Sequence, residues 1–232
     1  MKENGYEYVD LGLPSKTMWA TCNVGADKPE DEGLLFQFGR VDGYKYGYKN
    51  HKFKTKYQNL LDGSSSVYTP VTTSGKVYKA NDILDLSNDA AHVHMGGAWK
   101  MPTKDELEEL VNNTTQEVET MNGVKGMLFT SNINKRQLFI PFMQGYWFNG
   151  TWYSLDKSYI NMWTSQVHDS HINNAYELGC NSSGYVDVCH DGRTFTFSVR
   201  GVFKSNDTSN EHKNNVEHTN NVEYADNINM LI

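Results

Sequence analysis

The sequence predicts an α+β domain built from short antiparallel strands with two or three helices, most of them in the N-terminal half. The clearest helix signal is a capping box, Thr103-Lys-Asp-Glu106, directly before an apolar run. After Gly123 the chain turns to short alternating runs separated by Gly, Asn and Ser, a pattern typical of antiparallel hairpins. The 19 Gly, 14 Tyr and 10 Phe among 232 residues also indicate many strands and turns in one sizeable domain.

The first forty residues predict two strands followed by a helix. Residues 6–13 alternate and reach Pro14, which suits a strand ending in a turn. Residues 17–25 form a second strand closed by a glycine. Residues 29–39 begin with proline and three acids, as a helix N-terminus does. The segment from 40 to 82 has little periodicity and is interpreted as a long loop, either functional or specific to one family.

Helices are predicted again from residue 88, and strands follow them. Residues 88–97 indicate a short helix stopped by glycines. The helix capped by Thr103 is expected to reach about Asn112, with Leu107 and Leu110 on its apolar face. The predicted strands lie in the runs 126–131, 137–142, 146–154, 160–166, 175–180, 185–190 and 194–203.

The composition changes after residue 203, which predicts a domain over 1–203 and a tail over 204–232. The tail is polar and rich in asparagine, and the sequence Asn-Asn-Val-Glu occurs in it twice. On its own such a segment cannot bury enough apolar surface to fold. It is interpreted either as disordered or as an arm that orders against a partner.

Charge and hydropathy exclude several classes of protein. The net charge of −7 argues against a nucleic-acid binder, so the lysines between 45 and 56 are interpreted as a solvated loop. No apolar run is long enough to insert into a membrane, and no secretory signal is visible, so synthesis in a cytoplasm is expected. Three cysteines without zinc spacing predict neither a disulfide framework nor a zinc site.

No catalytic constellation stands out in the sequence. His92 and His94 are two residues apart, which places them on different faces of a helix. His168, His171 and His190 are scattered through the strand-rich half and are expected on surface loops. We find no Gly-x-Ser-x-Gly, no P-loop and no cysteine with an obvious base. We therefore expect no enzyme, no cofactor and no metal.

Several segments in register resemble a known family. They are YVDLGLPSKTMWATCNVGADKPEDEGLLFQFG, DILDLSNDAAHVHMGGAWKMPTKDELEEL, INMWTSQ and FTFSVRGV, in this order along the chain. Over residues 6–203 the chain resembles the Fibrobacter succinogenes major paralogous domain, similar to the formylglycine-generating-enzyme branch of the C-type lectin-like fold. Lys16 and Met95 depart from the usual Gly and Trp of that pattern.

The resemblance implies binding without catalysis. Cys180 and Cys189 do not lie in the setting of the catalytic cysteines of the enzyme branch. The Glu-Pro-Asn and Trp-Asn-Asp motifs of calcium-dependent lectins are also missing from the sequence. Neither formylglycine generation nor calcium-dependent glycan capture is therefore expected.

Related domains of gut bacteria and their phages often end in a region rewritten by diversity-generating retroelements, which change asparagine codons. The resemblance implies a constant framework of Trp163, Ser165, Ala175, Tyr176, Leu178, Val186, Val188, Arg193, Phe197, Ser198, Val199 and Arg200. The variable binding face implied between them is His168, Asp169, His171, Glu177, Gly179, Tyr185, Asp187, Cys189, His190, Asp191, Thr194 and Thr196. An asparagine codon can change in this way into most of that second set, but not into Glu177.

Strand alternation agrees with this division, since it places Val186 and Val188 on a core face and Tyr185, Asp187 and Cys189 on the other. We expect a non-catalytic receptor-binding protein on a virion surface, in multimeric display, with a host-surface protein or glycan as ligand. The tail would contact other virion proteins. The alternatives are a bacterial cell-surface or secreted binder, and a purely structural component whose outer face has no partner.

Overall fold

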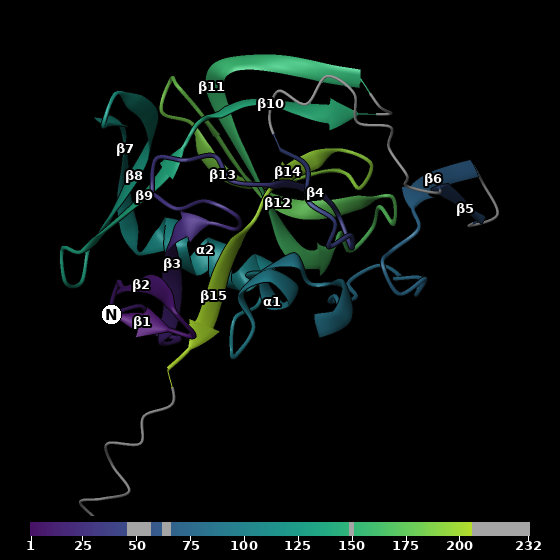
Figure 1. The fold of residues 1–232 in the computed structure, drawn as a ribbon, viewed down its shortest axis with the longest axis horizontal. Helices are drawn as coiled ribbons and strands as arrows, with labels where there is room; N and C mark the ends of the chain where they lie inside the picture. The colour runs from purple at the N-terminus through teal and green to yellow at the C-terminus, as the bar shows by residue number, and fades with distance from the viewer. Residues whose placement is uncertain (46–56, 62–65, 149–150, 206–232) are drawn as a thin grey trace, which may run out of the picture.

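Antiparallel strands make up most of this protein (Figure 1). The computed structural model describes residues 1–45, 57–61, 66–148 and 151–205. Strands hold 49% and helices only 10% of the structure. The prediction of an α+β fold is therefore wrong, and so is the C-type lectin-like fold in the α+β form expected from the resemblance. The architecture is mostly β, with curled antiparallel sheets.

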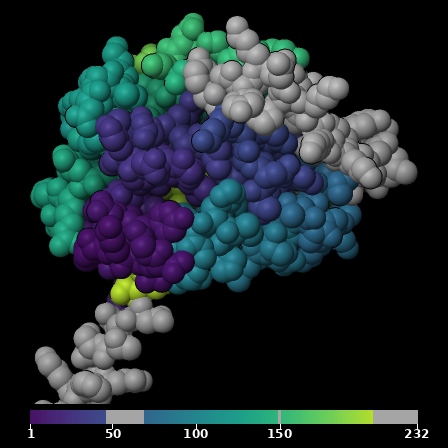
Figure 2. Space-filling view, viewed as in Figure 1, coloured from purple at the N-terminus to yellow at the C-terminus, as the bar shows by residue number. Residues whose placement is uncertain are grey.

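One sheet joins the two ends of the described chain. Its strand order is β1 (Lys2–Glu3), β2 (Tyr6–Asp10), β3 (Thr17–Asn23) and β15 (Arg200–Lys204). Trp19 of β3 lies opposite Val202 of β15. Figure 2 shows the N-terminal segment, in purple, beside the last described residues, in yellow. Strand β15, the last one that the structure describes, thus completes the sheet begun by β1, β2 and β3.

The largest sheet carries the predicted binding region. Its order is β13 (Val186–Gly192), β12 (Asn174–Asn181), β11 (Thr151–Val167), β14 (Thr196–Ser198) and β4 (Leu35–Gln37), and β10 (Met143–Phe148) also pairs with β11. The pairs are antiparallel except for β11 with β14. Strand β13 is the edge of this sheet, and β12 is an inner strand.

The remaining strands of the described residues form two smaller sheets. One is β7 (Thr114–Met121), β8 (Val124–Ser131) and β9 (Gln137–Pro141), and the other is the hairpin of β5 (Tyr57–Leu61) and β6 (Ser66–Pro70). The interpretation of residues 40–82 as loop throughout is wrong at β5 and β6. Their pairing needs no alternation in the sequence, because backbone hydrogen bonds alone define the register.

The helices are short. They are the 3₁₀ turn η1 (Leu86–Asn88), α1 (Ala90–Met95) and α2 (Lys104–Asn112). The capping box is confirmed, since the Thr103 hydroxyl accepts from the Glu106 amide and the Glu106 carboxylate accepts from the Thr103 amide. Leu107 and Leu110 are buried, as predicted, where α2 packs near β11, β12 and β13.

The helix predicted over residues 29–39 does not form. Gly33 has φ +76°, and a Cβ at this position would lie 2.5 Å from the Val24 carbonyl oxygen. The chain turns there, the Leu34 amide donates to Val24, and Leu35 begins β4. Pairing with β14, which is remote in sequence, therefore prevails over the acidic helix-start signal.

Three tryptophans from separated motifs lie in the core, as their setting in the sequence predicts. Trp19, Trp99 and Trp163 are each fully buried. Trp99 and Trp163 belong to one apolar cluster with Phe38 and Phe197, whereas Trp19 packs in a second cluster with Leu107, Leu110, Ile160 and Leu178. Strands β11 and β12 contribute to both clusters, so their two faces are both covered.

Two predicted segments fall largely outside the described residues. The tail over 204–232 is described only for Lys204 and Ser205, and the lysine-rich loop only up to residue 45. In the described part of the chain, no helix has the length and apolar character needed to cross a membrane.

Candidate binding surface

The predicted binding face divides between the two sides of the β12–β13 pair. Strand register places Gly179 opposite Asp187, Glu177 opposite Cys189 and Ala175 opposite Asp191. Alternating with these, Leu178 pairs with Val188 and Tyr176 with His190. Directly paired side chains share a face of the sheet. The acidic and thiol groups therefore lie on one side, and His190 lies on the other.

The residues of the predicted framework form the buried part of this region. Val186 and Val188 are half-buried against the second apolar cluster. The other framework residues are buried, namely Trp163, Ser165, Ala175, Tyr176, Leu178, Arg193, Phe197, Ser198, Val199 and Arg200. The scaffold under β13 is thus rigid by packing.

Eight of the twelve predicted face residues reach the surface. Asp169, His171, Tyr185, Asp187 and His190 are exposed, and Cys189, Asp191 and Thr194 are half-buried. The prediction is wrong for His168, Glu177, Gly179 and Thr196, which are buried. Glu177 and Gly179 belong to the inner strand β12, and Thr196 lies in β14 between β11 and β4.

Glu177 is a buried carboxyl with a single hydrogen bond. Asn161 Nδ2 donates to its Oε1 at 3.0 Å, and its Oε2 has no partner among the described residues. Burial raises the pKa of Glu177 well above its usual range, and the negative charge of Asp191 acts in the same direction. The protonated form is the one that this environment accommodates.

Replacing Glu177 with glutamine is expected to stabilise the protein at pH 7. In the unfolded chain a glutamate titrates near pH 4.3, whereas the folded carboxyl titrates well above that value. The unfolded chain loses its proton first, so the free energy of unfolding falls as the pH rises through the folded pKa. Each unit between the two pKa values corresponds to about 1.4 kcal/mol.

Urea denaturation of both forms between pH 4 and pH 8 measures this effect. Glutamine keeps a carbonyl oxygen for Asn161 and cannot ionise, so the stability difference should grow with pH. Glu119→Gln, at an exposed position, is the matched control and should show no such growth. If the free energies of unfolding of the Glu177→Gln and native proteins differed by the same amount at every pH in this range, the raised pKa of Glu177 would be contradicted.

Tyr185, Asp187 and Cys189 form a hydrogen-bonded group on the acidic side of β13. The Tyr185 hydroxyl lies 3.2 Å from Asp187 Oδ2 and 3.4 Å from Cys189 Sγ. Gly179 makes room for the thiol, because a Cβ there would lie 3.2 Å from Cys189 Sγ. Burial raises the pKa of Cys189, which makes this thiol a weaker nucleophile at neutral pH. The group suits recognition better than covalent chemistry.

An aromatic cluster that the sequence reasoning missed adjoins this side. Phe195 stacks on Phe148 with ring centroids 4.6 Å apart and meets Tyr146 edge-on at 5.1 Å. Tyr146 stacks on Tyr153, which is exposed. Burial raises the pKa of Tyr146, and the negative charge of Asp191 acts in the same direction. The run YWFNGTWYS carried the signal, but it was interpreted only as a strand pattern.

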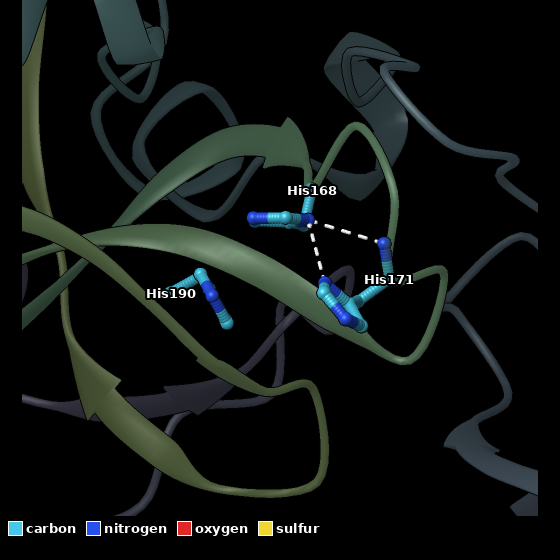
Figure 3. A group of neighbouring side chains, drawn as sticks. All are labelled: His168, His171 and His190. Atoms are coloured by element: carbon cyan, nitrogen blue, oxygen red, sulfur yellow. Dashed lines mark hydrogen bonds between the residues drawn. The ribbon is translucent and has the colours of Figure 1, made fainter.

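Three histidines meet on the other side of β13 (Figure 3). His168 Nδ1 lies 3.3 Å from His171 Nδ1, and the rings of His168 and His190 are 4.0 Å apart. The expectation of surface loops holds for His171, whereas His168 is buried and His190 belongs to a strand. Long-range pairing of β12 with β13 brings His190 to a loop that precedes it by some twenty residues.

Comparison with known proteins identifies no relative. No protein-family model, no curated protein and no solved structure matches this chain. The family resemblance therefore stays a prediction from the sequence motifs.

Proposed function

We propose that this protein is a non-catalytic binding protein displayed on a virion surface, with a protein or glycan of the host surface as its ligand. Its contact area is the acidic side of β13 with the adjoining aromatic rings, here called the β13 surface: Tyr185, Asp187, Cys189, Asp191, Tyr146 and Phe195. The virion setting rests on the family resemblance alone.

One observation carries the proposal. The β13 surface presents tyrosine, carboxylate and thiol groups from an edge strand whose valines are anchored in the core. Binding residues are commonly held on a rigid scaffold in this manner. Tyrosine supplies contact area together with a polar end, which is why it is enriched where binding energy concentrates. Side chains that do not support the core can also change without loss of the fold.

A panel of substitutions tests this arrangement. Val188→Ala should lower the free energy of unfolding by about 1–3 kcal/mol, because it removes buried methyl groups. Tyr185→Ala and Asp187→Ala should change it by under about 0.5 kcal/mol. The same two changes should weaken binding to bacterial cells about tenfold or more, since few residues carry most of an interface.

Thermal melting and cell binding of the purified variants are the two measurements. Glu119→Ala, exposed on β7, is the control and should alter neither. If the Tyr185 and Asp187 variants melt early, the β13 surface supports the fold and is not free to vary. If they melt and bind like the native protein, the domain is a structural component, which is the alternative function. Sequencing the locus across a population would show whether substitutions gather at the β13 surface.

A further inference from the structure

Three imidazole rings converge at the edge of the largest sheet from three places in the chain. His168 follows β11 directly, His171 lies in the connection to β12, and His190 belongs to β13. One nitrogen from each ring lies within 4.8 Å of the other two. Figure 3 shows the rings gathered around the loop, with His168 in contact with His171.

The connection between β11 and β12 holds two of these rings in place. The His168 amide donates to the Asn174 carbonyl at 3.0 Å, and the Asn174 amide donates to the His171 carbonyl at 2.8 Å. Buried Arg193 fixes the same segment, since its amide donates to Asn173 and its Nη1 to the Ile172 carbonyl at 3.0 Å. The donor groups therefore sit on a closed and anchored loop.

The third ring is fixed by β13. His190 lies opposite Tyr176 in the strand register, and its Nδ1 lies 2.8 Å from the Asn174 side-chain amide. Asn174 Nδ2 is the donor of this contact, so His190 Nδ1 is the acceptor and its lone pair points toward Asn174. A metal ion bound to Nδ1 would take the place of this hydrogen bond.

His168 is the buried member and presents an electron pair toward the cluster. Its Nδ1 accepts from the amides of Ser170 and His171 at 3.2 and 3.1 Å, both long hydrogen bonds. His171 Nδ1 also crowds the same atom. The Ser170 hydroxyl lies 3.4 Å from the same nitrogen, and a metal ion bound there would take the place of these contacts. His171 is exposed, so its ring can rotate toward a bound ion.

The charges that face the cluster favour a bound cation. Asp169 Oδ1 lies 3.4 Å from His168 Nδ1. Lys104 Nζ, over the Tyr176 ring, is paired with Glu108 at 3.2 Å. Neutral imidazole is the form that ligates a metal.

We infer that His168, His171 and His190 form a binding site for one divalent transition-metal ion, with Zn²⁺ as the best fit. Imidazole nitrogens prefer zinc, copper and nickel over magnesium or calcium. Tetrahedral zinc with bonds of about 2.0–2.1 Å brings its nitrogens to about 3.4 Å from one another. The His168–His171 pair already has this spacing, and a His190 nitrogen lies within 4.8 Å of a nitrogen of each of them. Water, Asp169 or a ligand carboxylate completes the coordination.

Metal titration of protein made without a histidine tag tests the site. Calorimetry with ZnCl₂ at pH 7.5 should show one ion per chain, and CoCl₂ should give the visible absorption of a four-coordinate ion. His171→Ala and His190→Ala should each weaken binding at least tenfold. Both positions are exposed, so the fold should be kept. Affinity should fall as the pH is lowered to 5, because protons compete with the metal ion for its ligand atoms.

His94→Ala is the matched control, since His94 is exposed and lies outside the cluster. Zinc should raise the melting temperature of the native and His94 proteins, because an ion that binds only the folded state stabilises it. Zinc should leave the melting temperature of the His190→Ala protein unchanged. Absence of zinc binding by the native protein, or equal binding by all variants, would overturn the site. Cell binding by the β13 surface is measured separately and is not decided by either result.

Discussion

Replacing Arg200 with alanine is expected to lower the free energy of unfolding by about 3–5 kcal/mol, because several buried acceptors lose a charged donor at once. Its guanidinium is fully buried, and burial lowers its pKa to about 10. Two of its nitrogens donate to Asn23 Oδ1 at 2.9 and 2.8 Å, and a third donates to carbonyls of Thr21 and Phe139. Removing the donor leaves several acceptors buried without it.

Chemical denaturation of the Arg200→Ala protein checks this value. Arg200→Lys should also lose stability, because one ammonium group cannot reproduce the planar arrangement of five donors. Arg136→Ala, on an exposed side chain beside Asp10, is the control and should change stability by under about 0.5 kcal/mol. If Arg200→Ala unfolds at the native midpoint, the guanidinium is not an essential connection between β3, β9 and β15.

Replacing Trp163 with alanine is expected to cost about 3–5 kcal/mol, as for large aromatic side chains in a core. The ring is fully buried, lies 4.4 Å from the Phe197 ring and meets Phe38 edge-on at 5.8 Å. Its Nε1 donates to the Phe36 carbonyl at 2.9 Å. The substitution removes the centre of one apolar cluster and a link between β11 and β4.

Trp163→Phe should lose less, because a smaller cavity remains and only one hydrogen bond is removed. Tyr159→Ala removes an aromatic ring that is 46% exposed on the same strand, and its smaller effect provides the reference. Thermal and urea unfolding of the three variants should rank them Trp163→Ala, Trp163→Phe, Tyr159→Ala in decreasing loss. Equal losses for Trp163→Ala and Tyr159→Ala would contradict the core position.

Local signals in the sequence predicted local structure well. The capping box at Thr103 predicted α2, because its hydrogen bonds close within one turn of the same segment. The alternation at Val186 and Val188 likewise predicted which side chains of β13 face the core. In both cases the physical cause lies within a few residues of the pattern.

Features that depend on distant pairing escaped prediction. Residues 29–39 combine acids and an apolar run, yet β4 forms because β14 and Tyr44 supply its partners. The α+β prediction failed for the same reason, because the high strand content depends on pairing between segments that are distant in the sequence. Glu177 lies on a strand covered on both faces, which its own alternation cannot reveal. The histidine cluster needs the β12–β13 register before His190 reaches His168.

The pairing of β3 with β15 has a consequence for synthesis. Arg200 donates to the carbonyl of Thr21, a residue 179 positions earlier in the chain. At roughly 5–20 residues per second, β3 leaves the ribosome on the order of ten seconds or more before its partner exists. During this interval its edge and the apolar surface around Trp19 stay uncovered, which invites pairing with other nascent chains. Chaperone capture should therefore persist until β15 has emerged.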